Sequence, residues 1–368
     1  MDTGQPQSTR ESPVVAELDD GRMQVTVAYH DPAAEEVWVL GGLAGADPGD
    51  RRMHRAGDGW WERTYELPRD VRTVYQFTRM RVPERAADVH RDPLNPRTHV
   101  YVRVPDDPDD EDLIASVLEL PGAPPLRWSV ERDGVPRGTV ELHRLASERL
   151  ANERRVYTYT PPGYDATRTY PLVVCFDGFA YVTDAYVPLP TVLDNLIADG
   201  RIPPVVAVLP DSLNQETRLR ELFLDDSFVE FLSDELLPWA HERLAFVDDP
   251  AQTVAAGSSA GGLTATFAAL RRSDLFGLVL SQSGAFSHGT LPHEYATHDR
   301  LSIRFYLDAG VLETSSVRAF APLLYANRHL RDVLLARGYE VTYREYPGGH
   351  DYLWWRETVA DGLIALLG

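Results

Sequence analysis

The sequence predicts an α/β protein in which a domain with a mostly parallel central sheet follows a smaller all-β domain. Up to about residue 105, short β-branched and aromatic segments alternate with turn residues, which is typical of an antiparallel sandwich. From about residue 137, buried strands alternate with longer helical segments, the pattern of a parallel sheet covered on both faces. At 368 residues the chain is long enough for two domains that each bury a core.

The all-β domain is expected over residues 13–105, after a polar, disordered tail at 1–12. Its strands are predicted at five segments rich in β-branched and aromatic residues, namely 23–29, 36–40, 60–65, 73–77 and 99–103. Residues 106–127 begin with acidic residues broken by prolines, so this segment is predicted to be a solvated linker.

The second domain is expected over residues 128–368. Parallel strands are predicted at 172–176, 205–209, 253–256, 278–281, 303–307 and 340–344, and antiparallel strands at 139–145 and 155–159. Helices with an amphipathic period are predicted at 228–243, 263–272 and 318–337.

Composition excludes several classes of partner. The formal net charge is −20, and the sequence contains no lysine, so all 36 basic residues are arginine. Nucleic acids and anionic membranes need clustered basic residues, so neither is an expected partner. No run of about 18 apolar residues is present to span a bilayer, and the N-terminus lacks the order of a secretory signal, which favours a cytoplasmic location.

The sharpest chemical signal is the motif Gly257-Ser258-Ser259-Ala260-Gly261. It follows the predicted strand 253–256 and precedes a predicted helix, the context of the nucleophile elbow of α/β-hydrolases. Small residues on both sides allow the sharp turn that lifts the serine oxygen above the sheet. Ser259 is therefore the predicted nucleophile, and the backbone N–H of Ala260 is a predicted oxyanion donor.

A second oxyanion donor is expected after an earlier central strand. The segment Phe176-Asp177-Gly178-Phe179 follows the strand at 172–176, and its glycine lets the backbone bend toward a substrate carbonyl. The backbone N–H of Phe179 is the predicted donor.

A serine hydroxyl needs a base, and the chain order of this fold places a histidine near the C-terminus. His350 follows the last predicted strand in a glycine loop and is the predicted base, whereas His329 lies within a predicted helix. The acid that orients the imidazole should follow strand 303–307. Glu313, in a loop, is preferred over Asp308 at the strand end, although the sequence leaves both open.

Together, these motifs resemble the enterochelin (enterobactin) esterase family. The resemblance spans nearly the whole chain and rests on an ordered series of short motifs. They are Asp92-Pro93-Leu94-Asn95-Pro96, Ser116-Val117-Leu118-Glu119-Leu120-Pro121, Leu209-Pro210-Asp211, Arg218-Leu219-Arg220-Glu221-Leu222, Glu235-Leu236-Leu237-Pro238-Trp239 and Gly349-His350-Asp351 with Trp355-Arg356.

The resemblance implies an immunoglobulin-like N-terminal domain and ester hydrolysis at Ser259 and His350, with no cofactor and no catalytic metal. A ferric ion would be cargo on a catecholate siderophore substrate in iron acquisition. Such a substrate is anionic and aromatic, so Arg218, Arg220 and Arg356 are expected to meet its charge and Trp355 to stack on its rings. The family's elbow usually has a bulkier residue than Ala260, so the acyl group accepted here is expected to differ.

The leading hypothesis is therefore a serine esterase acting on a small-molecule ester, a siderophore-like trilactone or related oligoester. The second hypothesis keeps the acyl-enzyme but passes the acyl group to an alcohol or amine, in secondary-metabolite biosynthesis. A polysaccharide esterase ranks third and a non-catalytic binding protein last.

Overall fold

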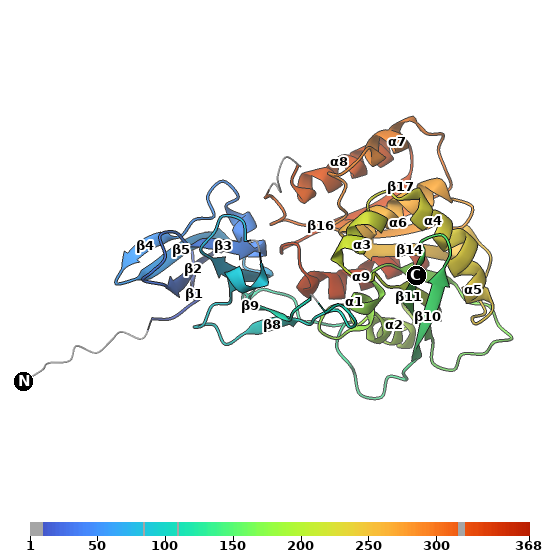
Figure 1. Cartoon of the computed structure of the whole chain (residues 1–368), viewed down its shortest axis with the longest axis horizontal. Coiled ribbons are helices and arrows are strands. Elements are labelled where there is room, and N and C mark those ends of the chain that lie inside the picture. The colour runs from blue at the N-terminus through green and yellow to red at the C-terminus, as the bar shows by residue number, and fades with distance from the viewer. Residues whose placement is uncertain (1–9, 84, 109, 316–320) are drawn as a thin grey trace, which may run out of the picture. The chain divides into compact units, whose positions relative to one another are not determined.

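The computed structural model describes residues 10–83, 85–108, 110–315 and 321–368. The chain forms two compact units, and each unit gathers segments that are separate in the sequence (Figure 1). Unit 1 contains Met1–Val102, Glu111–Pro124 and Pro347–Asp351. Unit 2 contains Arg103–Asp110, Pro125–Tyr346 and Tyr352–Gly368.

Unit 1 is built from two antiparallel sheets. Among the described residues, one sheet has the strand order β1-β2-β5-β4, and the other has the order β3-β6-β9-β8 with β7 also paired to β6. The strands are β1 (Val14–Glu17), β2 (Met23–His30), β3 (Trp38–Gly41), β4 (His54–Gly57), β5 (Trp60–Leu67), β6 (Arg72–Thr78), β7 (Val89–His90), β8 (Thr98–Tyr101) and β9 (Leu113–Glu119). All five predicted strands are present.

The inner faces of these sheets form the core of unit 1. Along β5, Trp61, Arg63 and Tyr65 are buried while their neighbours are more exposed, as strand alternation requires. Tyr29 of β2 and Phe77 of β6 bring the two sheets together, with ring centroids 4.9 Å apart.

A buried carboxylate, that of Asp92, connects three separate segments of unit 1. Asp92 is fully buried, and its Oδ2 accepts hydrogen bonds from Ser12 Oγ (2.5 Å) and Tyr75 Oη (2.7 Å). Asn95 Nδ2 donates to the same Tyr75 oxygen at 3.1 Å. The Asp92-Pro93-Leu94-Asn95-Pro96 motif is therefore a structural node. It also corrects the predicted tail, because Ser12 is buried; residues 1–9 of that prediction lie outside the described residues.

The predicted linker over residues 106–127 is also wrong. Its middle forms β9, which pairs with both β6 and β8 and buries Ala115 and Leu118. Its acidic start is held within unit 2, where the Asp106 carboxylate pairs with Arg144 at 2.7 Å and Arg155 at 3.3 Å. A strand therefore follows the acidic residues directly, and the charge of Asp106 is paired with arginines from distant segments.

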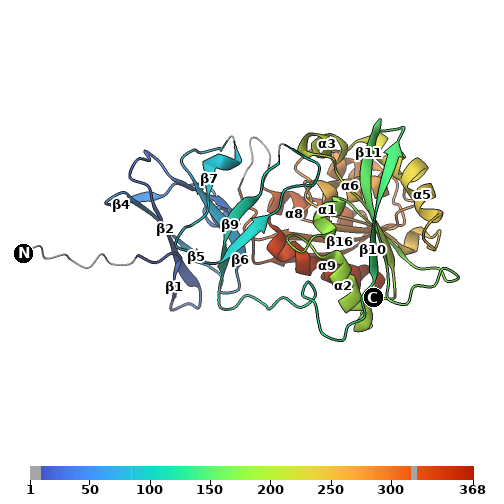
Figure 2. The same ribbon diagram turned by 60° about the horizontal axis from the view of Figure 1, so that its bottom comes forward.

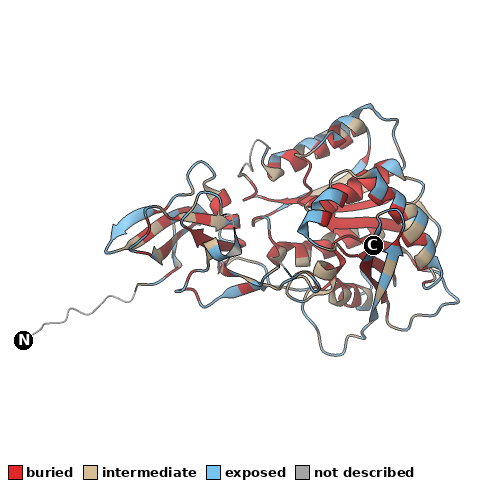
Figure 3. Cartoon of the chain, in the orientation of Figure 1, coloured by how far each residue is buried: buried red, intermediate tan, exposed pale blue. Residues whose placement is uncertain are grey.

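Unit 2 contains the predicted, mostly parallel sheet. Within the described chain its strand order is β10-β11-β13-β12-β14-β15-β16-β17. Strand β11 pairs antiparallel with both β10 and β13, and all the other neighbouring strands pair in parallel. The strands are β10 (Thr139–Ser147), β11 (Asn152–Thr160), β12 (Leu172–Cys175), β13 (Val206–Pro210), β14 (Thr253–Ser258), β15 (Leu278–Gln282), β16 (Arg304–Gly310) and β17 (Glu340–Tyr346). The central strands are buried (Figure 3).

Helices cover both faces of this sheet. One face packs on α4, α5, α6, α7 and α8, and the other on α1, α2 and α9 (Figure 2). The helices are α1 (Gly178–Val182), α2 (Leu189–Ala198), α3 (Gln215–Glu221), α4 (Asp226–Phe231), α5 (Leu237–His241), α6 (Ala260–Arg271), α7 (Leu291–Thr297), α8 (Leu323–Ala336) and α9 (Tyr352–Leu367).

The predicted helices are present with changed limits. The one at 228–243 consists of α4 and α5 joined by a π-helical turn, Leu232–Leu236. The start of the one at 318–337 lies outside the described residues, and α8 begins at Leu323. Helix α9 was not predicted, because apolar residues lie on most sides of this buried helix and weaken its amphipathic period. No helix in the described ranges is both long and apolar enough to cross a membrane.

Tyr75→Phe should lower the free energy of unfolding by about 1–3 kcal/mol, because Asp92 and Asn95 each lose a buried hydrogen-bond partner. Urea denaturation followed by circular dichroism measures this cost. Tyr65→Phe is the matched control, since the buried Tyr65 hydroxyl has no hydrogen-bond partner among the described residues. Equal losses in the two variants would contradict the role given to the Tyr75 hydroxyl.

Candidate active site

Ser259 lies at a strained turn between β14 and α6. Its backbone angles are φ 55° and ψ −116°, a conformation that residues with a side chain rarely adopt. Backbone hydrogen bonds to the end of β15 and the segment after it hold it there: Ser259 N–H donates to the carbonyl of Gln282 (2.8 Å), and the Ser259 carbonyl accepts from Ala285 N–H (3.0 Å). Ser259 as a whole is neither fully buried nor fully exposed.

The glycines of the motif allow close backbone packing. A Cβ atom on Gly257 would lie 2.6 Å from the carbonyl carbon of Gly261, which real Cβ contacts essentially never reach. A Cβ on Gly262 would collide with Ser281 Oγ. Gly261 itself has room, since the nearest atoms to a Cβ there lie at 3.5 Å. The first glycine is therefore required by packing, while the last is not.

Strand register brings the candidate acids to the same edge of the sheet as the serine. Ser258 pairs with Gln282 on β15, and Gln282 pairs with Asp308 on β16. Because these strands are parallel, the residues that follow them meet at the carboxyl edge. Ser259 and Glu313 both follow such strand ends.

Glu313 has the surroundings of an ionised carboxylate. Its side chain is buried, and Oε1 accepts hydrogen bonds from Ser283 Oγ (2.5 Å), Tyr346 Oη (3.0 Å) and Gly310 N–H (3.0 Å). Donors directed at one oxygen favour the charged form of the acid.

Asp308 has the opposite surroundings. It is completely buried, and its Oδ1 accepts from the Ser283 N–H at 3.2 Å. Burial raises the pKa of the Asp308 carboxyl well above its ordinary value, so the neutral form is favoured. A residue that must stabilise an imidazolium needs a negative charge, and this contrast supports Glu313 over Asp308.

His350 lies in the five-residue segment between β17 and α9 that belongs to unit 1. Within unit 1, the Asp351 carboxylate accepts from Thr73 Oγ1 (2.8 Å), and the carbonyl of Pro347 accepts from the Arg72 N–H (3.1 Å). The side chain of His350 is exposed. Its role as the base for Ser259 remains a prediction from chain order.

The two predicted oxyanion donors have different surroundings. Ala260 is the first residue of α6, where backbone N–H groups have no acceptor within the helix. The N–H of Phe179, in contrast, donates to Asp211 Oδ1 at 2.9 Å, and Arg155 Nε donates to Oδ2 of the same carboxylate at 2.8 Å. The structure therefore gives the Phe179 hydrogen an acceptor that the sequence did not suggest.

Known proteins identify the family. The esterase family model matches residues 147–366. The iron(III) enterobactin esterase of Escherichia coli O6:H1 (strain CFT073) is 30% identical over 402 residues, covering 97% of this chain and 94% of that protein. The chain belongs to the enterochelin (enterobactin) esterase family.

Two further relatives support the same family. The iron(III) enterobactin esterase of Dickeya dadantii is 35% identical over 273 residues, an alignment that covers 68% of this chain and 61% of that protein. The crystal structure of the enterobactin esterase of Shigella flexneri, solved in the presence of enterobactin, superposes with a TM-score of 0.75 and 28% sequence identity. The match covers 97% of this chain and 96% of that protein. This member of the enterochelin esterase family is thus a hydrolase of ester bonds with an α/β-hydrolase-type fold.

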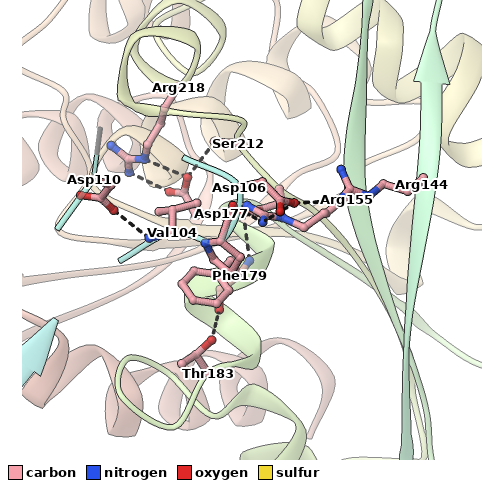
Figure 4. A network of polar contacts seen from close by, with 12 residues as sticks. Val104, Asp106, Asp110, Arg144, Arg155, Asp177, Phe179, Thr183, Ser212 and Arg218 are labelled. Atoms are coloured by element: carbon pink, nitrogen blue, oxygen red, sulfur yellow. Dashed lines mark hydrogen bonds and ion pairs between the residues drawn. The ribbon is translucent and has the colours of Figure 1, made fainter. Parts of the chain in front are cut away.

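In this esterase, Arg218 forms a two-pronged ion pair with Asp177 at the start of α1. Arg218 Nε and Nη2 lie 2.8 and 2.7 Å from the two Asp177 oxygens, and Ser212 Oγ adds a hydrogen bond at 3.1 Å (Figure 4). Burial opposes the charge of Arg218, but Asp177 raises its pKa above the ordinary value. Asp177 has a left-handed φ of 60°, so the pair fixes a strained turn beside the elbow. Sequence reasoning missed Asp177.

The other residues predicted to bind substrate fall into two groups. Arg220 is exposed, with its nearest carboxylate, Glu221, at 3.6 Å, so it stays a candidate for an anionic ligand. Arg356 donates to the carbonyls of Tyr186 (3.0 Å) and Asp184 (2.9 Å) and so supports the loop between α1 and α2. Trp355 is only 3% exposed, which leaves no open face for a catechol ring and corrects the stacking prediction.

Gly257→Ala should lower kcat/KM for a p-nitrophenyl ester by about 100-fold, because the added methyl group displaces the turn that carries Ser259, the predicted nucleophile. Gly261→Ala, in the same motif, should retain activity, since its methyl group has room. Thermal melting checks that both variants fold. Equal activity losses would contradict the packing argument.

Arg218→Met should destabilise the protein by about 3–5 kcal/mol, because it leaves the buried Asp177 carboxylate without its ion-pair partner. The double variant Arg218→Met with Asp177→Asn should recover part of this loss, as measured by urea denaturation. If Arg218→Met instead raised KM for ferric enterobactin at unchanged stability, Arg218 would be a substrate contact.

Proposed function

We propose that this chain is a serine esterase that hydrolyses the ester bonds of a catecholate trilactone siderophore, or a related oligoester, through an acyl-enzyme on Ser259. The observation that carries the proposal is the strained backbone of Ser259 between β14 and α6, with glycine packing that only a sharp turn requires. The enterobactin esterases that resemble the chain over nearly its full length support the substrate class.

The proposed reaction has two halves. Ser259 Oγ attacks the ester carbonyl while His350 takes the serine proton, and the N–H of Ala260 stabilises the resulting oxyanion. His350 then gives the proton to the departing alkoxide, which leaves as an alcohol. Water next loses a proton to His350 as it attacks the acyl-enzyme, and collapse of that intermediate returns the proton to Ser259 and releases the acid.

Glu313 completes the proposed triad. It accepts a hydrogen bond from the imidazole, which keeps the other ring nitrogen directed at the serine and stabilises the imidazolium. The three donors to Glu313 Oε1 support this role, because they favour a carboxylate that stays ionised.

Water is the proposed acyl acceptor. The related proteins are named as esterases, which favours hydrolysis over transfer to an alcohol or amine. In a ferric siderophore the metal would be part of the substrate, and opening the trilactone would weaken its hold on iron. We place this activity in the cytoplasm, the location that the sequence favours.

We also propose a fold for unit 1. Its two antiparallel sheets and the ring contact between them support an immunoglobulin-like sandwich ahead of the catalytic domain. Arg220 is the proposed contact for the anionic substrate, because its guanidinium is exposed and only loosely paired.

Ser259→Ala should abolish hydrolysis of ferric and iron-free enterobactin, because the acyl-enzyme cannot form. Liquid chromatography of the opened trilactone measures turnover, and intact mass after fluorophosphonate treatment should show one adduct on the wild type and none on the variant. Ser258→Ala, its neighbour in the motif, is the control and should keep the adduct.

An adduct without trilactone opening would retain the serine esterase and reject the siderophore substrate. An adduct that persists in Ser259→Ala would reject the nucleophile.

A further inference from the structure

Ser283 lies directly after β15, between the nucleophile turn and the candidate acid. It is completely buried and has a left-handed φ of 48°, which is uncommon for a residue with a side chain. Its backbone contacts Asp308 within β16, and its side chain contacts Glu313, just after β16, and Tyr346, the last residue of β17. A strained and buried polar residue is costly and persists only where the surrounding structure stabilises it, which often occurs at functional sites.

The contacts of the Ser283 and Tyr346 hydroxyl groups restrict where the two hydroxyl hydrogens can point. Ser283 Oγ, Tyr346 Oη and Glu313 Oε1 contact one another at 2.5, 2.7 and 3.0 Å. The indole N–H of Trp355 donates to both hydroxyl oxygens, at 3.0 Å each. The two hydroxyl groups have one hydrogen each and cannot both donate to each other. At least one hydrogen therefore points at Glu313, which is the arrangement that an ionised carboxylate requires.

The backbone of Ser283 is fixed from the other side. Its N–H lies 2.9 Å from the carbonyl oxygen of Asp308 and 3.2 Å from Oδ1 of the same residue. These contacts hold the left-handed turn and so direct the Ser283 hydroxyl toward Glu313. Asp308 thereby has a structural task that fits a neutral, buried acid.

The segment that contains Ser283 also holds the nucleophile. The carbonyl of Gln282 accepts from the N–H of Ser259 at 2.8 Å, and the N–H of Ala285 donates to the carbonyl of Ser259 at 3.0 Å. Between them, the carbonyl of Gly284 accepts from Asn327 Nδ2 at 2.9 Å. Residues 282–285 thus connect the backbone of the serine to the side chain of the acid.

We propose that Ser283 is a positioning residue that orients the Glu313 carboxylate and fixes its place relative to the Ser259 turn. This inference rests on the proposed function, because it assumes that Glu313 is the acid of the triad. Ser283 itself contacts neither substrate nor reacting atoms. Its effect passes through Glu313, and that requirement makes the proposal testable.

Ser283→Ala should lower kcat for a p-nitrophenyl ester by about 10- to 100-fold with little change in KM, because Glu313 loses its shortest hydrogen bond. The alanine keeps the Cβ atom, so the backbone strain is unchanged. Ser281→Ala is the matched control: Ser281 Oγ is equally buried, lies two residues away, and has no hydrogen-bond partner within the described chain. It should leave kcat unchanged.

A double-mutant cycle separates positioning from general damage. In a Glu313→Ala background, Ser283→Ala should cause no further loss of kcat, because the group through which it acts is gone. The same additional loss in both backgrounds would overturn the proposal. Tyr346→Phe removes a second donor to the same carboxylate oxygen and should give a smaller loss in kcat. This variant provides the test if Ser283→Ala fails to fold.

The outcomes for the two proposals differ. An unchanged kcat in Glu313→Ala would remove the acid from the proposed function, and this inference with it. A large loss in Glu313→Ala with unchanged kcat in Ser283→Ala and Tyr346→Phe would overturn only the positioning role. Unaltered fluorophosphonate labelling of Ser259 in Ser281→Ala confirms that the control leaves the nucleophile intact.

Discussion

The backbone of Ser259 imposes the constraint on which the catalytic unit depends. Holding a residue with a side chain at φ 55° costs about 1–3 kcal/mol, so the surrounding structure must stabilise it. The close contact of Gly257 with Gly261, together with the hydrogen bonds to Gln282 and Ala285, provides that support. The parallel pairing of β14, β15 and β16 brings the candidate acids to the same edge of the sheet as Ser259.

Local features of the sequence predicted the larger part of the fold and the sharp turn at Ser259. Glycine spacing around Ser259 and the alternation of buried strands with helices act over a few residues, so the sequence displays them directly. The sequence does not show which side chains from distant segments become partners in the fold. Arg218 looks like a free cation until the fold brings Asp177 to within 2.7 Å, and Phe179 looks like a free donor until Asp211 reaches its N–H. The sequence separations hide such pairs.

The burial and hydrogen-bond donors around each carboxylate, and not its position along the chain, distinguish the two candidate acids. In the fold Asp308 lies within β16 and Glu313 just after it, so both are close to the carboxyl edge of the sheet, and position along the chain was a weak reason to prefer one of them. In the fold, one carboxylate receives three donors while the other is enclosed where burial favours its neutral form. Several residues of the family motifs, including Asp92, Asp211 and Trp355, likewise maintain structure, so a shared motif residue is not by itself a ligand contact.

Unit 1 has a consequence for how the chain folds during synthesis. The backbone of Gly349 packs directly against Gly42, and the Asp351 carboxylate binds Thr73, so the segment Pro347–Asp351 completes a unit whose strands come from the first third of the chain. On the ribosome, the N-terminal sheets emerge long before this segment does. They must therefore wait, with those contacts unmade, until almost the whole polypeptide has been translated, and a chain terminated early loses part of its N-terminal unit as well as its last helix.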